Sequence, residues 1–237
     1  MLKKIAALTI IALSGILLQS PAEASHSWNG YHWARTNNPF PISLGDNVSG
    51  SWDSELRVAS SNWSVSTVLD THVVQGWSNR SCKPIVGRVE VCNAKYGRNG
   101  WLGVATVWIS GDHIIQGTVK LNDSYQMSSA EKQLVVCQEI GHTLGLDHQD
   151  EVFDNANLNT CMDYTSSPES NQHPNQHDYD ELEFIYNHVD STNTAFASTT
   201  SSSSGALNVG WGIKASDHLY IKDLGHGNKA YTFVVSV

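Results

Sequence analysis

The spacing of the polar residues in the stretch QEIGHTLGLDH constrains this chain more than any other feature of its sequence. Residues four apart lie on one face of a helix, so Gln138 and His142 share a face and Glu139 lies beside it. Gly145 follows His142 by about one turn, and glycine adopts the left-handed conformation that ends a helix and reverses the chain. The reversal directs His148 back toward His142. The spacing therefore predicts two imidazoles, an amide and a carboxylate around one point.

These side chains make up the donor set that a catalytic zinc site requires. Such a site has three protein ligands, one open position and a base for the water bound there. We predict His142 and His148 as two of the ligands, with Gln138 at the third position and Glu139 as the base. A single pair of histidines at this spacing would be incidental in most helices, so the prediction rests on the whole set.

The same stretch resembles the metzincin zinc metalloproteases, whose motif HExxHxxGxxH is followed by a turn that contains methionine. Residues 138–148 depart from this motif at Gln138, and residues 160–164 read TCMDY, which is similar to the methionine turn. A looser likeness to bacterial secreted matrixin-like proteins runs from about Trp33 into the C-terminal tail. The resemblance implies an α+β, metzincin-like zincin fold, with a twisted mixed sheet, an active-site helix, a C-terminal helix and a short β tail.

The resemblance also implies a role for each matching residue. His142 and His148 would hold Zn²⁺, and Glu139 would act as the general base toward a water that the zinc activates. Tyr164 would hydrogen-bond the tetrahedral intermediate, and Met162 would form an apolar floor beneath the metal. The activity implied is that of a secreted, zinc-dependent endopeptidase that hydrolyses extended polypeptides.

Gln138 stands where the metzincins have their first histidine ligand. An amide oxygen is a neutral and weaker zinc donor than imidazole, which leaves three outcomes open. Gln138 ligates through its oxygen, another donor completes the shell, or the metal is lost and the fold serves as a non-catalytic binding module. Glu139 speaks against the last outcome, because a pure scaffold has no chemical need for it. A weaker interpretation is that the chain is a surface-adhesion or structural protein.

The chain has four cysteines, an even number that in an exported protein suggests two disulfides. Three pairings are possible, and a zinc site of all four is disfavoured because the C-x-x-C spacing does not occur. We favour Cys82–Cys92, which closes a short local loop, together with Cys137–Cys161. The reason for the second pair comes from the resemblance, because a bridge there would brace the site if the methionine turn lies under the helix.

The N-terminus has the pattern of a secretory signal peptide. Lys3 and Lys4 precede an apolar run, and the sequence AEA then supplies small residues at both cleavage-defining positions. We predict residues 1–24 as this peptide, cleaved before Ser25, and therefore a secreted mature protein without a membrane-spanning segment. The other predicted parts are the catalytic domain at 25–190, a Ser/Thr-rich linker at 191–207 and a short β segment at 208–237.

Apolar periodicity and capping residues predict three helices and four strands in the main body. Residues 113–122 alternate between apolar and polar side chains, and Lys120 suits an exposed edge of a sheet. Such an edge can pair with an extended peptide, but an ordinary solvated edge is the preferred interpretation. In the tail, two strands are expected around the turn at Gly225 and Gly227. The predicted helices are 51–64, 128–144 and 173–188, and the predicted strands are 68–77, 88–97, 104–110 and 113–122.

The formal net charge of −9 disfavours nucleic acid as a partner, because phosphate binders carry a basic face. The acidic run at residues 147–154 leaves Ca²⁺ as an option, although the EF-hand spacing is absent and a solvated loop is preferred. His72 and His113 are expected to be ordinary strand histidines. His173 and His177 are not expected to form a paired site. We expect a monomer.

Overall fold

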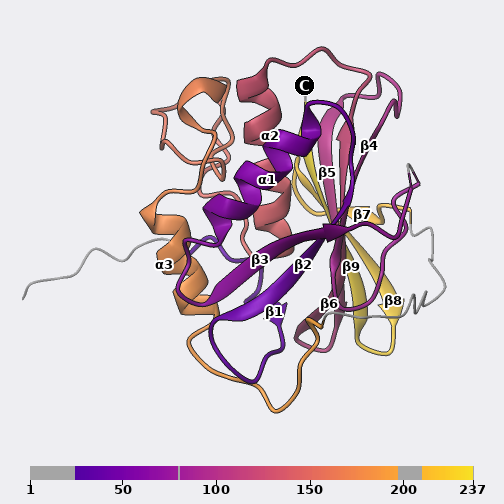
Figure 1. The fold of residues 1–237 in the computed structure, drawn as a ribbon, viewed down its shortest axis with the longest axis vertical. Coiled ribbons are helices and arrows are strands. Elements are labelled where there is room, and N and C mark those ends of the chain that lie inside the picture. The colour runs from indigo at the N-terminus through magenta and orange to yellow at the C-terminus, as the bar shows by residue number, and fades with distance from the viewer. Residues whose placement is uncertain (1–24, 80, 197–209, 237) are drawn as a thin grey trace, which may run out of the picture.

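The computed structural model describes residues 25–79, 81–196 and 210–236. The predicted signal peptide and residues 197–207 of the predicted linker lie outside these ranges. Within the three described ranges, every helix is too short or too polar to cross a membrane. The described part of the chain forms one mixed sheet with helices packed on one of its faces (Figure 1).

A mixed sheet forms the frame of the molecule. Its strands are β1 (His32–Trp33), β2 (Phe40–Asn47), β3 (Leu69–Gln75), β4 (Val89–Ala94), β5 (Trp101–Ser110), β6 (His113–Asn122), β7 (Ile213–Lys214), β8 (Leu219–Gly225) and β9 (Asn228–Ser236). They follow the order β3-β2-β4-β6-β5-β9-β8-β7, and β1 pairs with β6 outside this path. The pairs from β3 to β6 are parallel, whereas every pair from β6 to β7 is antiparallel.

The helices are α1 (Trp52–Trp63), α2 (Ser129–Thr143) and α3 (Gln176–Ile185), and a short 3-10 helix spans Pro168–Ser170. The predicted capping box of Ser128 and Glu131 begins α2, and Asn175 with Asp178 forms a second one before α3. Each box satisfies backbone N–H groups that have no partner within the helix. The starts of α2 and α3 are therefore set by local sequence, whereas Ser51 makes no side-chain capping bond at the start of α1.

Large aromatic side chains fill the core between the helices and the sheet. The largest that are almost completely buried include Trp33, Trp52, Trp63, Tyr186 and Phe233. An aromatic side chain buries roughly 150–250 Å², so each contributes on the order of 4–6 kcal/mol at most to burial of apolar surface. One core of this kind spans the whole described body, from the first strands to the last.

The predicted fold class is confirmed. The protein is α+β, with a twisted mixed sheet, a helix that carries the motif, a C-terminal helix and a short β tail (Figure 1). All predicted helices and strands of the main body are present, and their ends lie within three residues of the expected ones. The periodicity of apolar residues located these elements, whereas strands β1 and β2 were not predicted.

The prediction that residues 113–122 form an edge strand is wrong. Strand β6 lies between β4 and β5 and is hydrogen-bonded on both sides. Its two faces are both covered: a Cβ on Gly117 would contact Thr143 of α2, and Lys120 lines a cavity on the opposite face. Alternation of apolar and polar residues along a strand indicates that its two faces have different surroundings. It does not show whether the strand is hydrogen-bonded to a neighbour on both edges.

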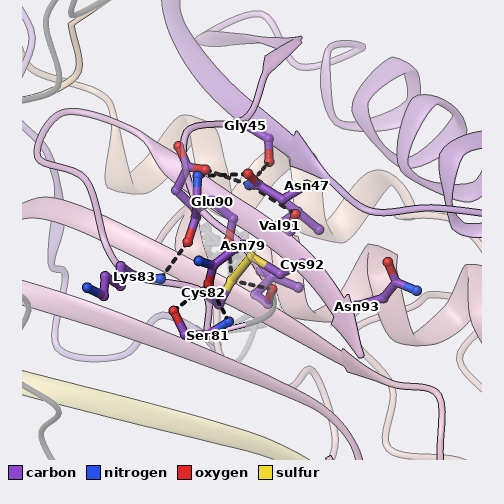
Figure 2. The surroundings of a disulfide bond; sticks show 12 residues. Gly45, Asn47, Asn79, Ser81, Cys82, Lys83, Glu90, Val91, Cys92 and Asn93 are labelled. Atoms are coloured by element: carbon purple, nitrogen blue, oxygen red, sulfur yellow. Dashed lines mark hydrogen bonds between the residues drawn. A yellow bond between two sulfur atoms is a disulfide. The ribbon is translucent and has the colours of Figure 1, made fainter. Parts of the chain in front are cut away.

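Both predicted disulfides are present, and Figure 2 shows the surroundings of Cys82–Cys92. This bridge ties the loop after β3 to β4. Beside it, Glu90 is fully buried and pairs with Arg88, whose Nε lies 2.7 Å from Glu90 Oε1. Asn47 also donates to Glu90, so the buried carboxylate is compensated by a cation and an amide.

The C-terminal tail forms the predicted hairpin and extends the main sheet. Strands β8 and β9 flank the turn at Gly225 and Gly227. Strand β9 then pairs antiparallel with β5 along most of its length, from Trp101 opposite Ser236 to Ser110 opposite Asn228. Without β7, β8 and β9 of the tail, β5 would be the edge strand on this side of the described sheet.

Candidate functional site

Helix α2 carries Gln138, Glu139 and His142 of the predicted site, and buried indoles hold its C-terminal end. The last four carbonyl groups of a helix have no partner within the helix. The indole of Trp28 donates to the carbonyl of His142 at 3.1 Å. The indole of Trp33 donates to the carbonyl of Thr143 at 2.8 Å. The end of α2, including the first histidine, is therefore fixed from the side of the N-terminal segment.

Gly145 reverses the chain as its position in the motif predicts. Its φ is +110°, a conformation that residues with a Cβ rarely adopt. A Cβ here would also lie 2.7 Å from the carbonyl oxygen of Tyr31. The reversal is thus enforced by backbone conformation and by a close neighbour, and it returns His148 to the side of α2.

His142 and His148 lie side by side, with ring centroids 4.8 Å apart and an interplanar angle of 75°. Nδ1 of His142 contacts the carbonyl oxygen of Leu146 at 2.9 Å. Because a carbonyl only accepts, Nδ1 carries the proton and Nε2 keeps a lone pair. Burial, together with the nearby His148, lowers the pKa of His142 well below its usual value, so the imidazole is neutral.

Buried polar atoms without partners converge at these histidines. Nε2 of His142 and both ring nitrogens of His148 make no hydrogen bond to any residue in the described ranges, and the carboxylate of Glu139 has no side-chain partner there. Buried polar groups in folded proteins are almost always paired. Imidazole nitrogens are donors that Zn²⁺ takes, and a catalytic zinc site also needs a base beside them, so the residues present fit a zinc ion.

Glu139 is fully buried against β5. Burial raises the pKa of its carboxyl well above the usual range, and the backbone N–H groups of Ala105 and Val235 lower it by smaller amounts. A Cβ on Gly103 would lie 2.5 Å from Oε1 of Glu139, so a glycine is needed where β5 passes this close. A carboxylate with a raised pKa takes up protons readily, as a general base near neutral pH must.

Gln138 lies buried on the same helix face and is anchored through its nitrogen. Its Nε2 donates to the carbonyl of Asp163 at 3.4 Å. An amide ligates metals through its oxygen, so this hydrogen bond does not use the ligating atom. The arrangement is compatible with Gln138 as an oxygen donor at the position predicted for the third ligand.

The turn that contains Met162 lies beneath α2, where the sequence resemblance places it. Met162 is fully buried, and a Cβ on Gly141 would overlap with its Sδ. The Cys137–Cys161 disulfide joins the helix to this turn across a sequence separation of 24. The bridge therefore restrains the residues on either side of the site, next to Gln138 and Met162.

Tyr164 lies beyond His148, with ring centroids 5.8 Å apart. Burial raises the pKa of the Tyr164 phenol, and a hydrogen bond with Ser236 lowers it by a smaller amount. The phenol therefore keeps its proton at neutral pH and can donate it in a hydrogen bond. A cavity of about 270 Å³ opens beside Tyr164, and its lining includes Gln138 and Val235.

Two residues of the tail lie in this site, and the sequence reasoning did not find them. The ring of Phe233 stacks on His142 with centroids 4.2 Å apart. The ring centroid of His218 lies 5.4 Å from that of His148 and 4.0 Å from that of Tyr164. The alternation of apolar residues in β9 predicts a covered strand face, but no motif connects that face with α2.

The acidic run after the motif gives no support to a calcium site. Asp150 accepts hydrogen bonds from the backbone of Val152 and the side chain of Asn155, so it closes its own loop. Glu151 is exposed and lies 4.0 Å from Nδ1 of His148. These contacts describe a surface loop next to the second histidine.

The remaining histidines differ in their surroundings. His72 is half exposed and lies 3.3 Å from Asp70 on the same strand. His173 contacts Asn62, whereas His177 stacks on His26, so the two do not form a paired site. His113 lies on a strand, as expected, and its Nε2 is 3.3 Å from Oδ1 of Asp190, next to His32 and His188.

A larger cavity, of about 460 Å³, lies on the other face of the sheet. Val104, Thr106 and Trp108 line it, and these residues alternate along β5 with the ones that face α2. The described residues that line this cavity include neither a histidine nor a carboxylate. Its lining includes Lys83, Lys120 and Tyr96 but lacks the ligands that zinc takes, so the candidate metal site is the one on α2.

Comparison with known proteins gives similarity to solved structures only. No protein-family model matches the chain, and no curated protein matches it. Two structures of myroilysin superpose with a TM-score of 0.39 at 12% identity, covering 65% of this chain and 86% or 82% of theirs. High choriolytic enzyme 1, a hatching enzyme zinc-protease from Oryzias latipes (Medaka fish), gives a TM-score of 0.38 at 15% identity, covering 66% of this chain and 94% of that one. A likeness at this level assigns neither a family nor an activity to the chain.

Proposed function

We propose that this chain is a secreted, zinc-dependent endopeptidase of metzincin type, and that it acts as a monomer on extended polypeptides. The observation that carries the proposal is the convergence of unpaired, buried histidine nitrogens beside a buried carboxylate that has no side-chain partner in the described ranges. The motif spacing from Gln138 to His148 and the methionine turn beneath α2 support the same reading. Export fits two disulfides and the N-terminal pattern, because disulfides persist in oxidising compartments.

In this proposal the residues that would hold the metal are His142, His148 and Gln138. Zinc, when bound, supplies a Lewis acid that polarises the scissile carbonyl and acidifies the attacking water. His142 is prepared for this role because the carbonyl of Leu146 fixes its tautomer, and metal-ligating histidines typically have such a partner behind them. The amide oxygen of Gln138 is the weakest of the three donors.

Glu139 would transfer the proton of the attacking water, and Tyr164 would stabilise the negative charge that develops on the substrate oxygen. Glu139 takes the proton of the attacking water and passes it to the leaving amine. The protonated phenol of Tyr164 donates a hydrogen bond to the oxygen on which negative charge develops. Met162 and the disulfide behind it keep the floor of the site apolar and rigid.

The tail sets a condition on this function. An extended polypeptide binds most simply by adding a strand to a sheet edge, and the edge next to α2 is that of β5. Strand β9 already pairs with β5, and its Phe233 lies on the ring of His142. A polypeptide substrate therefore approaches Glu139 through the cavity beside Tyr164, or after β9 has moved off β5.

The test compares the full-length chain with Glu139→Gln, which keeps the shape of the side chain and removes the base. Cleavage of a mixed peptide library should be sensitive to chelators, and the variant should lose at least about a hundredfold in kcat/KM. Its zinc content, measured by elemental mass spectrometry, should equal that of the unaltered protein. Cleavage that survives chelation, or that is equal in both proteins, would contradict the proposal.

A second candidate is a non-catalytic secreted binding module on the same fold. One observation favours it: Phe233 covers His142 while Gln138 replaces a stronger ligand. In that case the site of the native chain would take up no zinc, and the carboxylate of Glu139 would serve no reaction. The two candidates can be separated without any assay of activity. The zinc bound at this site is the difference in zinc per chain between the unaltered protein and His148→Ala.

A further inference from the structure

A second cluster of metal-ligating side chains lies outside the candidate site and shares no residue with it. His32 is on β1, whereas His188 and Asp190 follow the end of α3, and their ligand atoms all lie within 4.8 Å of one another. His113, the first residue of β6, joins them because it is directly opposite His32 in the pairing of β1 with β6. Three segments that are distant in sequence thus bring three imidazoles and one carboxylate together.

Several donor–donor distances in the cluster, measured to one or the other oxygen of Asp190, are close to those in a zinc site. Nε2 of His32 lies 3.2 Å from Nε2 of His188 and 3.6 Å from Oδ2 of Asp190. Oδ1 of Asp190 lies 3.7 Å from Nε2 of His188 and 3.3 Å from Nε2 of His113. Zinc bonds of about 2.0–2.2 Å in a tetrahedron place neighbouring donors about 3.3–3.6 Å apart.

The tautomer of His32 directs a lone pair into the cluster. Its Nδ1 lies 2.9 Å from the carbonyl oxygen of Gly30, so Nδ1 carries the proton and Nε2 is the acceptor. A backbone carbonyl behind the ring is the partner that metal-ligating histidines typically have. His188 faces His32 through its own Nε2, and a cation bound by both nitrogens would replace the 3.2 Å contact between them.

Arg35 orients the carboxylate of the cluster. Its guanidinium Nη1 and its backbone N–H each lie 3.1 Å from Oδ2 of Asp190, and the guanidinium also donates to the carbonyl of His188. These bonds hold one side of the carboxylate and leave Oδ1 turned toward His113 and His188. Because Asp190 balances the charge of Arg35, the neutral imidazoles supply the affinity, as they do in zinc sites with three histidines.

Half of the cluster is buried and half is open to solvent. The side chains of His32 and Asp190 are 8% and 12% exposed, whereas those of His113 and His188 are 33% and 48% exposed. The buried pair is held in place by Gly30 and Arg35 before any ion arrives. The exposed pair gives an ion a path from solvent and can close over it.

We propose that His32, His188 and Asp190, with His113 as the fourth donor, form a second metal site of the zinc class. Three nitrogens and one oxygen favour zinc over calcium or magnesium, which take oxygen ligands. Four protein donors leave no open position, so the site is structural. A metal there ties β1 and the start of β6 to the segment that follows α3, and its binding energy adds to the stability of the fold.

The experiment measures zinc per chain by elemental mass spectrometry after equilibration with zinc and removal of the free metal. His188→Ala should bind one zinc fewer per chain than the unaltered protein, and His113→Ala should bind that zinc at least about tenfold more weakly. Both histidines are partly exposed, so neither change removes a core side chain. His72→Ala, a part-exposed histidine 3.3 Å from Asp70, is the matched control and should leave the count unchanged.

Thermal unfolding gives a second readout. Zinc should raise the Tm of the unaltered protein and of His72→Ala, and it should raise the Tm of His188→Ala less, because a ligand stabilises only the state that binds it. Equal zinc counts and equal shifts in Tm for His188→Ala and the unaltered protein would overturn the proposal. The compared proteins all have the same residues at the site on α2. Any zinc bound there is therefore the same in each of them, and the difference reports the second site alone.

Discussion

The ring of Phe233 lies parallel to the imidazole of His142, with the two centroids 4.2 Å apart and an angle of 9° between the planes. Phe233 is near the C-terminus, and His142 is in the motif that defines the candidate site. The tail is therefore part of the wall of this site. Strand β9 is held there both by its pairing with β5 and by this aromatic contact.

We predict that Phe233→Ala loosens the tail from the site. The side chain is fully buried, so its loss should lower the free energy of unfolding by about 3–5 kcal/mol. Amide protons of β9 should exchange at least about tenfold faster than in the unaltered protein, because each 1.4 kcal/mol of lost local stability corresponds to a factor of ten. Urea unfolding and hydrogen exchange measure the two effects.

Val234→Ala is the matched control for this change. Val234 is the neighbouring residue on the same strand, is 5% exposed and packs with Trp101 and Val104 on the other face of the sheet. It should destabilise the protein without changing the surroundings of His142. If the imidazole signals of His142 shift equally in both variants, Phe233 does not anchor β9 at the site.

Gln138→His should strengthen zinc binding at α2 by about tenfold or more. Imidazole is a better donor for zinc than an amide oxygen, and the carbonyl of Asp163, which accepts from Gln138, is placed to accept from the N–H behind a ligating imidazole nitrogen. Competition with a chromogenic chelator gives the affinity, and His148→Ala in the same background reports the loss of that site. Equal affinity in Gln138→His and the native chain would mean that residue 138 does not face the metal.

Gly145→Ala should destabilise the protein by about 2–4 kcal/mol. One part of the loss is the strain of a positive φ, about 1 kcal/mol or more for a residue with a Cβ. The other part is the approach of the new Cβ to within 2.7 Å of the carbonyl of Tyr31. Chemical denaturation gives the change in the free energy of unfolding.

Gly50→Ala separates these two parts. Gly50 has a φ of +71°, but a Cβ there would have open space around it. It should therefore cost only the strain, about 1 kcal/mol. A loss at Gly145 no larger than the loss at Gly50 would show that the close approach to Tyr31 is relieved by a small backbone shift.

The local parts of the site could be predicted from the sequence because they depend on neighbours along the chain. The helix bounds of α2 follow from the capping box at Ser128, and the meeting of His142 with His148 follows from the reversal at Gly145. The Cys137–Cys161 pairing was inferred from resemblance to a family, since spacing alone left three pairings open.

The non-local parts could not be predicted, because strand order and tail docking are decided by packing across the whole chain. His32 and His188 are 156 residues apart, and neither lies in a motif. From the sequence alone, His113 is predicted to be an ordinary strand residue. Its place opposite His32 follows only from the pairing of β1 with β6. In the same way, Phe233 enters the site only because β9 pairs with β5.

Removal of the two disulfides should have different consequences for the site. By the loop-entropy relation, a bridge over a separation of 24 contributes about 3.5 kcal/mol and one over a separation of 10 about 2.7 kcal/mol. Replacing Cys137 and Cys161 by alanine should therefore lower both stability and zinc affinity, because the bridge joins α2 to the turn with Met162. Replacing Cys82 and Cys92 should lower stability alone. Equal losses of zinc affinity would show that the bridge beside the site acts only through global stability.

Tyr179 provides a test of stability against pH that is independent of metal. Burial, with a smaller contribution from Asp178, raises the pKa of Tyr179 to about 12 from the ordinary value of 10.0. The folded state thus favours the protonated phenol, which donates to the carbonyl of Asn62 at 2.8 Å. This contribution to stability is fully present below about pH 10, and it is lost as the pH rises through about 12.

Tyr179→Phe should be less stable than the unaltered protein at pH 8, by about 1 kcal/mol for the lost hydrogen bond. The difference between the two proteins should shrink as the pH rises from about 10 toward about 12, because only the unaltered protein must keep this phenol protonated to stay folded. Urea unfolding at a series of pH values measures the difference, and the other tyrosines cancel because both proteins contain them. A difference that stays constant between pH 8 and pH 11 would mean that Tyr179 ionises equally well in the folded and unfolded chains.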